Sequence, residues 1–288
     1  MTARPERKRR RRTGIFRALL RNPSGLVGLV IVVLYAATAI LAGLGVTPFP
    51  PAEQHAIDRL QGPSAEYLMG TDLFGRDLLS RVMEGAKNSL NVALLSVLLA
   101  GSSGITIGLL AGYVGGRLDN LLMRVMDVFL AFPALLLALL VITVIGPSVK
   151  GAVLAIGVVY TPIFARVARG PVLAVKELEY VQAGRSLGAS NLRILIQHVL
   201  PNILAPLLVQ LSLALSWALL TEASLSFLGL GIQPPAASWG VMLAESRGLA
   251  ERAPWLMAFP GAAIALGVLG FNLLGDGLRD VLDPKSRR

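Results

Sequence analysis

The sequence contains no cysteine and only two histidines, His55 and His198, which lie far apart in its 288 residues. Disulfide bonds, zinc–thiolate sites and thiol nucleophiles are therefore excluded, and a metal site built on histidines is not expected. Charged residues make up 15% of the chain, against about 25% in soluble domains. The phosphate-binding pattern G-x-x-x-x-G-K-[ST] is also missing. We therefore assign no catalytic, cofactor-binding or metal-binding residue, and do not expect an enzyme.

Apolar residues are abundant instead, at 54% of the chain with a mean hydropathy of +0.66. They occur in long runs with almost no charge, and a bilayer core about 30 Å thick needs about 20 such residues in a helix. The predicted transmembrane helices are Gly25–Val46, Asn88–Gly116, Val128–Val149, Gly151–Ala165, Ile203–Thr221 and Ala253–Gly275. The sequence thus predicts an all-α membrane protein with six transmembrane helices.

The basic residues set the orientation. Six consecutive ones, Arg7 to Arg12, precede the first apolar run, which favours a cytoplasmic membrane anchor over a nucleic-acid-binding segment. With the N-terminus in the cytoplasm, 20 of the 27 Lys and Arg residues lie inside and 7 outside. The positive-inside rule therefore predicts a multi-pass membrane protein with both termini cytoplasmic, and no nucleic-acid partner is expected.

These spans divide the chain into segments. The predicted order is a basic cytoplasmic segment (1–24), a first transmembrane helix (25–46), an external loop with an amphipathic helix (47–87), a core of five helices (88–277) and a cytoplasmic tail (278–288). Within the core, residues 171–200 form a cytoplasmic loop that is expected to be helical, with a sharp turn at Gly188, because glycine tolerates backbone angles that other residues avoid.

Four glycines recur at every fourth residue: Gly104, Gly108, Gly112 and Gly116. On a helix they form a ridge without side chains, where a neighbouring helix can approach closely. We interpret the ridge as a packing seam, and a surface that slides during transport is the alternative.

A few charged residues lie near the predicted spans. Glu222 ends the fifth span on the outer side and is a candidate pathway residue, although a hydrated or helix-paired carboxylate is the alternative. Asp72, Arg76 and Asp77 are spaced as in a turn that begins a helix, which favours a local ion pair or helix cap over a substrate contact. Asp127, at a cytoplasmic helix end, is expected to be solvated or paired.

The cytoplasmic segment after the fourth span is rich in small residues and suits insertion into a groove on another protein. It also resembles the EAA loop of binding-protein-dependent ABC importer permeases, which reads Glu-Ala-Ala, three residues, Gly, nine residues, Ile-x-Leu-Pro. Here Gln182 begins the pattern, Gly188 is the central glycine and His198–Pro201 ends it. The resemblance implies contact with an ATPase subunit through a coupling helix of Val181, Gln182, Ala183, Gly184, Arg185, Ser186, Leu187, Gly188 and Ala189.

Other stretches resemble the C-type permease of dipeptide, oligopeptide and nickel ABC importers. They are Met69–Arg81, Gly112–Asp119, Met123–Asp127 with Ala131–Pro133, and Glu222–Gly231. The resemblance covers roughly residues 15–284 and implies a type I importer permease fold. It also implies a B-type partner permease, two ATPase subunits that bind ATP and magnesium, and an external solute-binding protein.

Two other classes were weighed against an ABC permease. An ion-coupled secondary transporter often has inverted repeats and ionisable residues at the membrane midplane, and neither is evident here. A membrane-embedded enzyme needs a convergent set of catalytic groups, for which the sequence offers few candidates. The leading function is a permease subunit that forms half of a translocation pathway for peptides or similar small solutes. The sequence leaves the substrate open among dipeptides, oligopeptides, nickel chelates and glutathione.

Overall fold

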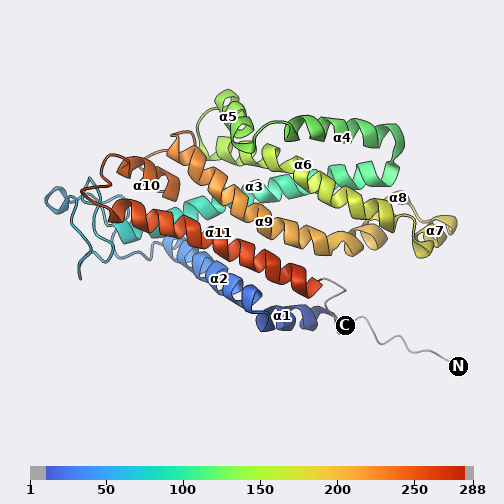
Figure 1. The fold of residues 1–288 in the computed structure, drawn as a ribbon, viewed down its shortest axis with the longest axis horizontal. Helices are drawn as coiled ribbons and strands as arrows, with labels where there is room; N and C mark the ends of the chain where they lie inside the picture. The colour runs from blue at the N-terminus through green and yellow to red at the C-terminus, as the bar shows by residue number, and fades with distance from the viewer. Residues whose placement is uncertain (1–10, 283–288) are drawn as a thin grey trace.

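The computed structural model describes residues 11–282, and side chains from Phe16 onward. The described chain is an elongated bundle whose long helices run roughly along its longest axis (Figure 1). Its helices are α1 (Arg11–Arg21), α2 (Pro23–Gly43), a 3-10 turn (Ala56–Asp58), α3 (Leu78–Val114), α4 (Gly116–Leu130), α5 (Ala134–Ile145), α6 (Val149–Val175), α7 (Glu179–Ser186), α8 (Asn191–Ile194), a π-helical turn (Leu195–Val199), α9 (Leu200–Phe227), α10 (Trp239–Ser246) and α11 (Trp255–Leu282).

Five stretches of helix are long and apolar enough to cross a membrane, and the bent pair of α4 and α5 makes a sixth if it counts as one span. The five are α2, α3, α6, the continuous helical stretch Asn191–Phe227, and α11. This confirms the all-α class and, with the bent pair, the predicted number of spans. Most helices extend beyond their predicted runs, because polar residues at their ends lie outside the apolar core.

The third predicted span is not a single helix. It was placed at Val128–Val149, but α4 ends at Leu130 and α5 begins at Ala134, with an angle of 95° between them. Pro133 explains the break, because proline lacks a backbone N–H and disfavours the helical conformation of the residue before it. Residues 116–127, predicted on the cytoplasmic side, belong to α4, which packs along α3 and α6 (Figure 1).

The external segment also differs from its prediction. Residues 47–77 form loops and turns, and the expected separate amphipathic helix is instead the first part of α3, which runs unbroken from Leu78 to Val114. The Asp77 side chain caps this helix by accepting a hydrogen bond from the Ser80 N–H at 2.8 Å. At 37 residues α3 is about 55 Å long, so it projects beyond a bilayer core of about 30 Å.

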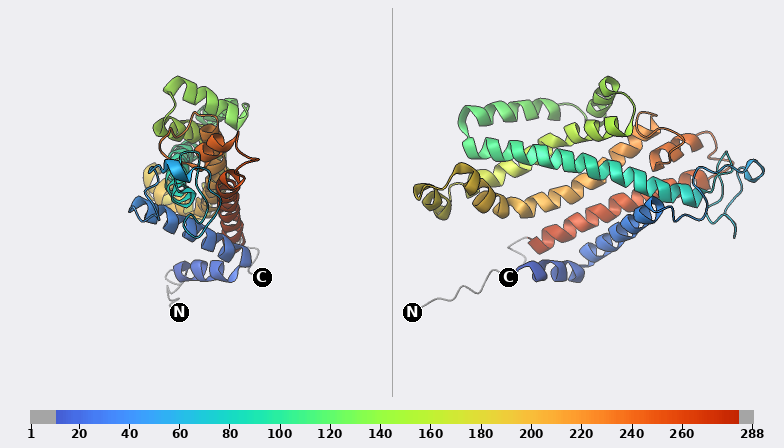
Figure 2. Two further views of the ribbon diagram at one scale, coloured as in Figure 1. Left: turned by 90° about the vertical axis from the view of Figure 1, so that its left-hand side faces the viewer. Right: turned by 180° about the vertical axis from the view of Figure 1, so that it is seen from behind.

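The two ends of the described chain lie at the same end of the bundle (Figure 2). Asn22 caps α2 by accepting a hydrogen bond from the Gly25 N–H at 2.9 Å, and its amide donates to Asp280 in α11 at 3.0 Å. Pro23 then starts α2 at the position where a missing N–H costs nothing. The shared end agrees with termini on one side of the membrane.

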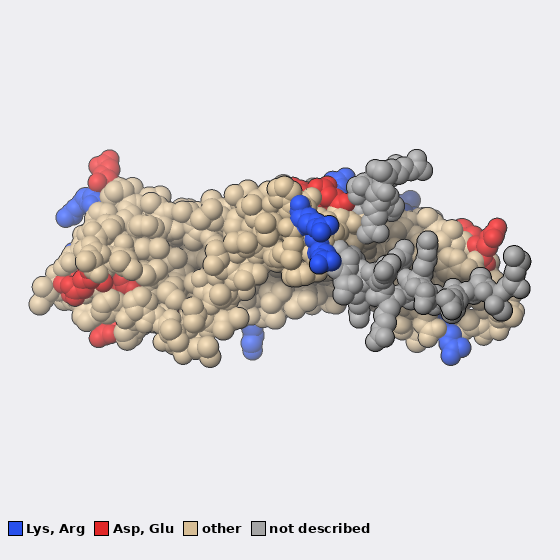
Figure 3. Space-filling model, turned by 90° about the horizontal axis from the view of Figure 1, so that it is seen from below, with Lys and Arg blue, Asp and Glu red and all other residues tan. Residues whose placement is uncertain are grey.

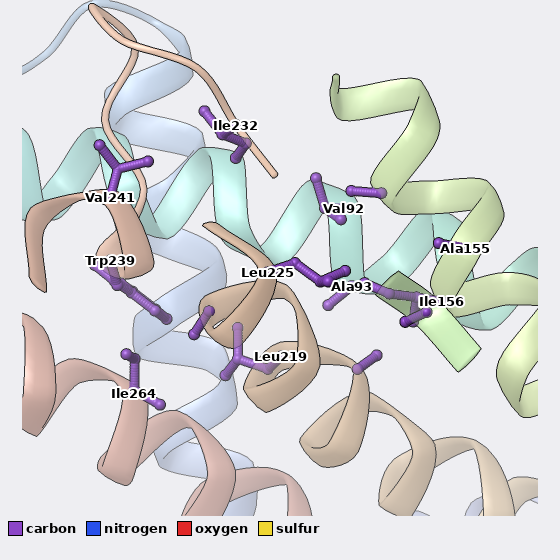
Figure 4. Packing of buried hydrophobic residues seen from close by; sticks show 14 of the residues in the cluster. Val92, Ala93, Ala155, Ile156, Leu219, Leu225, Ile232, Trp239, Val241 and Ile264 are labelled. Carbon is purple, nitrogen blue, oxygen red and sulfur yellow. The ribbon is translucent and has the colours of Figure 1, made fainter. Parts of the chain in front are cut away.

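Two hydrophobic cores stabilise the bundle. The larger lies toward the outer end, where residues such as Val92, Ile156, Leu219 and Trp239 pack together from α3, α6, α9 and α10 (Figure 4). The smaller joins the cytoplasmic ends of α3, α6 and α9 to the segment between α6 and α9. Its members are Tyr113, Ala168, Val172, Val181, Ile194, Val199, Ile203 and Leu207.

Charged side chains are few on the face of the bundle that Figure 3 shows, where most of the surface is neither acidic nor basic. Large apolar side chains are exposed on the helices, among them Val33, Leu98 and Leu140. An exposed apolar surface of this extent belongs in lipid or against another membrane subunit.

The predicted orientation can be tested by cysteine labelling, because the natural chain has no cysteine. We expect Ile57→Cys, whose native side chain is 96% exposed in the external loop, to react with an impermeant maleimide added to intact spheroplasts. Arg185→Cys, at the opposite end in α7, should react only after the membrane is opened. Labelling of position 185 from outside would contradict the topology.

Candidate functional site

The segment that is expected to couple to an ATPase forms two short helices at the end of the bundle that is predicted to be cytoplasmic. α7 spans Glu179–Ser186 and α8 spans Asn191–Ile194. Gly188 lies between them with a φ angle of +82°, in the left-handed region that favours glycine. The expected sharp turn at Gly188 is therefore present.

A single buried side chain anchors α7 to the bundle. Val181 is 3% exposed and belongs to the smaller core, together with Tyr113 of α3 and Val172 of α6. Ile194 and Val199, which lie between α7 and α9, are fully buried in the same core. α7 therefore contacts the ends of three membrane helices and is not a free loop.

Polar contacts fix the entry to α7. Lys176, the residue that ends α6, donates from Nζ to the Gly112 carbonyl of α3 at 2.9 Å. The Gln182 side chain donates from Nε2 to the Lys176 carbonyl at 2.9 Å. Gln182, the residue at which the sequence departs from the family's Glu, thus acts inside the chain by holding α7 against the end of α6.

Aromatic residues hold both ends of α7 in place. The Tyr113 hydroxyl donates to Asn191 at 3.0 Å, and the Arg185 guanidinium lies 5.4 Å from the centre of the Tyr113 ring. Tyr180 accepts a hydrogen bond from the Asn202 amide at 2.9 Å, which joins α7 to the start of α9. These roles were not predicted from the sequence. The place of Tyr113 in Gly112–Asp119, a stretch that resembles the permease family, was the signal that could have indicated them.

The predicted coupling residues divide into a covered set and an exposed set. Val181 is buried, and Gln182, Gly184 and Ala189 are half-buried. The exposed set is Ala183, Arg185, Ser186, Leu187 and Gly188. Leu187 is 89% exposed, and a Cβ atom added at Gly184 or Gly188 would meet no atom within 4 Å. The exposed set therefore forms a thinly covered surface that is open to a partner.

The glycine ridge packs against α6 of the same chain. A Cβ atom on Gly104 would lie 2.5 Å from the Cβ of Phe164, and one on Gly108 would lie 2.7 Å from the Cβ of Ala168. Gly112 meets Val172 in the same way. Gly116 is not part of this seam, since it begins α4 with a φ angle of +60° and has open space around it. The facing helix is thus α6, and the ridge requires no partner subunit.

Glu222 lies in the interior of the bundle and not at a hydrated edge. Its side chain is 0% exposed, and Oε1 accepts a hydrogen bond from the Ser226 hydroxyl at 2.7 Å. In this conformation the carboxyl group is covered by its own chain, and the role of Glu222 in a pathway stays a prediction.

Ion pairs occupy both ends of the bundle. At the outer end, Asp72 and Arg76 form the expected local pair, and Glu245 of α10 accepts from Arg76 at 3.0 Å and from Arg81 at 3.1 Å. At the other end, Arg169 of α6 donates two hydrogen bonds to Asp119 of α4, at 2.6 and 2.7 Å. A second pair joins Asp127 to Arg166 at 2.5 Å, so Asp127 is paired. Together the two inner pairs hold α4 against α6.

Comparison with known proteins identifies the family. Residues 104–288 match the family described as "Binding-protein-dependent transport system inner membrane component". The chain belongs to this family. Residues 13–63 also match the N-terminal transmembrane domain of oligopeptide transport permease C. The permease is therefore a multi-pass subunit of an ABC importer in the inner membrane, and the family component is a non-catalytic one.

Curated relatives and a solved structure agree with this assignment. The permease is 46% identical to the dipeptide transport system permease DppC of Alkalihalophilus pseudofirmus, over 94% of this chain and 89% of the relative. It is 42% identical to the glutathione transport system permease GsiD of Pectobacterium atrosepticum, over 94% and 90%. A chain of the inward-facing MetNI methionine ABC transporter shares the fold, with a TM-score of 0.57 and 18% identity, over 69% of the permease and 94% of that chain.

The seam between α3 and α6 gives a test of the packing. We expect Gly108→Ala to destabilise the permease by about 1–3 kcal/mol, because the added methyl group meets the backbone of α6 and cannot be relieved by a side-chain movement. Gly261→Ala in α11 is the matched control, since its Cβ would meet no atom within 4 Å. Thermal unfolding in detergent measures both, and equal midpoints for the two variants would contradict the seam.

Proposed function

We propose that the permease moves peptides across the inner membrane as one half of a translocation pathway. A B-type permease would supply the other half, and an external solute-binding protein would deliver the peptide. Relatives that are 42–46% identical over nearly the whole chain support this substrate class, because most are named as dipeptide or peptide permeases. Glutathione, the substrate in the name of one relative, is itself a small peptide.

We further propose that two separate ATPase subunits supply the energy and bind ATP and magnesium. The permease sequence has no P-loop of its own. The observation that carries this proposal is the thinly covered surface of α7, where small residues leave room for a partner at the cytoplasmic end. A short helix of this kind suits a groove in an ATPase, with Leu187 and Arg185 as its projecting contacts.

The attachments of α7 offer a route from the ATPase to the membrane helices. α8, the π-helical turn and α9 form one continuous helical stretch from Asn191 to Phe227, so displacement of α8 displaces the inner end of α9. Lys176 and Val181 tie the same segment to α3 and α6. Coupling between distant sites is explained by a rigid element that both sites bias, and these contacts support such a role for α7.

Gly188→Val tests the coupling role. A β-branched residue is strongly disfavoured at a φ angle of +82°, and its side chain would project into the space that a partner must fill. We expect normal membrane abundance, loss of peptide uptake, and either loss of the ATPase on purification or ATP hydrolysis without uptake. Gln182→Ala should be milder, because it removes one hydrogen bond within the chain and leaves the turn at Gly188 and the exposed surface of α7 unchanged.

Gly45→Val is the matched control for backbone strain. Gly45 has a φ angle of +75° and also has open space around it, but it follows α2 at the opposite end of the bundle. We expect this variant to retain its ATPase partners. Normal uptake by Gly188→Val at normal abundance would show that the segment is an ordinary loop.

Assembly gives a second test. We expect the permease to purify with a homologous permease and two ATPase subunits, and we expect the isolated chain to show neither ATP hydrolysis nor uptake in liposomes. The substrate class can be tested by measuring dipeptide, tripeptide and glutathione binding to the cognate solute-binding protein. Uptake by liposomes that contain the isolated chain alone would refute the proposed division of labour.

A further inference from the structure

The outer segment between α9 and α11 does not lie loosely over the bundle. Residues 231–241 return toward α3 and α9, and Ile232, Trp239 and Val241 of this segment are buried in the larger core (Figure 4). Gly240 lies so close to α9 that a Cβ atom there would clash with the Ala223 carbonyl group. The backbone of the segment is therefore seated directly on α9.

Three backbone N–H groups of this outer segment donate to three serine hydroxyls. Ile232 donates to Ser226 of α9 at 3.2 Å, and Trp239 donates to Ser89 of α3 at 3.4 Å. Val241 donates to Ser238, which caps α10, at 3.3 Å. The serine partners on α9 and α3 are 1% and 0% exposed, so water does not compete for these hydrogen bonds.

The same three serines meet at Glu222. The Ser226 hydroxyl donates to Oε1 at 2.7 Å, and the hydroxyls of Ser89 and Ser238 lie beside the same carboxyl group. Oε2 has no hydrogen bond of good geometry, and no Lys or Arg of the described residues forms an ion pair with Glu222. A hydroxyl that accepts from a backbone N–H still has its own hydrogen to donate. Ser226 donates it to the carboxyl group, and Ser89 and Ser238 lie near enough to the same group to do so.

We infer that Glu222 is a positioning residue that holds the outer segment 231–241 to α9 and α3 through these serines. Its carboxyl group orients the hydroxyls, and the hydroxyls hold the backbone of the segment. Glu245, which pairs with Arg76 and Arg81, fastens the far end of α10 to the start of α3. The outer segment is thereby attached at two points.

This attachment has a consequence for transport that rests on the proposed function. A displacement of α9 that begins at α7 reaches the outer end of the bundle at Glu222, which lies near the outer end of that helix. With the serine contacts intact, the outer segment moves with α9. Without the serine contacts, α9 moves while the outer segment stays in place.

The test uses the assembled importer with a cysteine reporter at Ala237, a fully buried residue of the outer segment. An impermeant maleimide added from outside measures how often the segment opens, without ATP or substrate. We expect Glu222→Met, which keeps the bulk but removes the acceptors, to raise the labelling rate about tenfold. Glu222→Gln keeps one acceptor oxygen and should raise the rate about threefold or less. Peptide uptake is measured for each variant both with and without the reporter cysteine.

Ser216→Ala is the matched control, because Ser216 is also fully buried on α9 but donates to Val268 of α11. It should label at the parent rate. If the Glu222→Met variant does not assemble, Ser226→Ala serves in its place, because it removes one of the serine hydroxyls. Its labelling rate should rise above that of the parent, but by less than tenfold. Parent-rate labelling in the assembled Glu222 or Ser226 variant would overturn the inference, and so would faster labelling with unchanged uptake. Failure of the coupling proposal alone would appear as normal uptake in Gly188→Val while the labelling differences remain.

Discussion

Close approach of helix backbones is the constraint on which the rest of this structure depends. Lipid provides no hydrophobic drive between helices, so van der Waals contact and hydrogen bonds must hold them together. The seam of Gly104, Gly108 and Gly112 lets α3 lie against α6 along the inner half of the bundle, and a Ser103–Thr161 hydrogen bond of 2.8 Å joins the same pair. The inner end of this seam forms the smaller core, on which Val181 and α7 are seated.

Charged side chains are buried where other interactions offset the free-energy cost of removing them from water. A buried ion pair must recover a large desolvation cost through good geometry and further hydrogen bonds. Arg76 meets these terms at the outer end, in a cluster with Asp72, Arg81 and Glu245. Asp119 and Arg169 do so near the inner end through two parallel hydrogen bonds. Glu222 is the exception, because among the described residues the Ser226 hydroxyl, and not a cation, donates a hydrogen bond to it.

The apolar runs were sufficient to predict the class of fold and most spans, because a charge-free stretch of bilayer length has few other uses. They could not predict where α3 begins, since Asp77 and the polar first turns of the helix resemble a loop in composition. Pro133 was a visible signal for the broken span, but the apolar residues on both sides concealed it. Gly188 was predictable from glycine chemistry. The setting of Glu222 was not, because Ser89 and Ser238 reach it from distant parts of the chain.

We propose that α7 is seated in an ATPase subunit and passes its motion to the membrane helices. A photo-crosslinking residue at Leu187, which is 89% exposed, tests this contact in the assembled importer, with Ile57 at the opposite end as the control position. The account predicts a crosslink from position 187 to an ATPase subunit and none from position 57. Crosslinks from position 187 only to lipid or to the partner permease would contradict it.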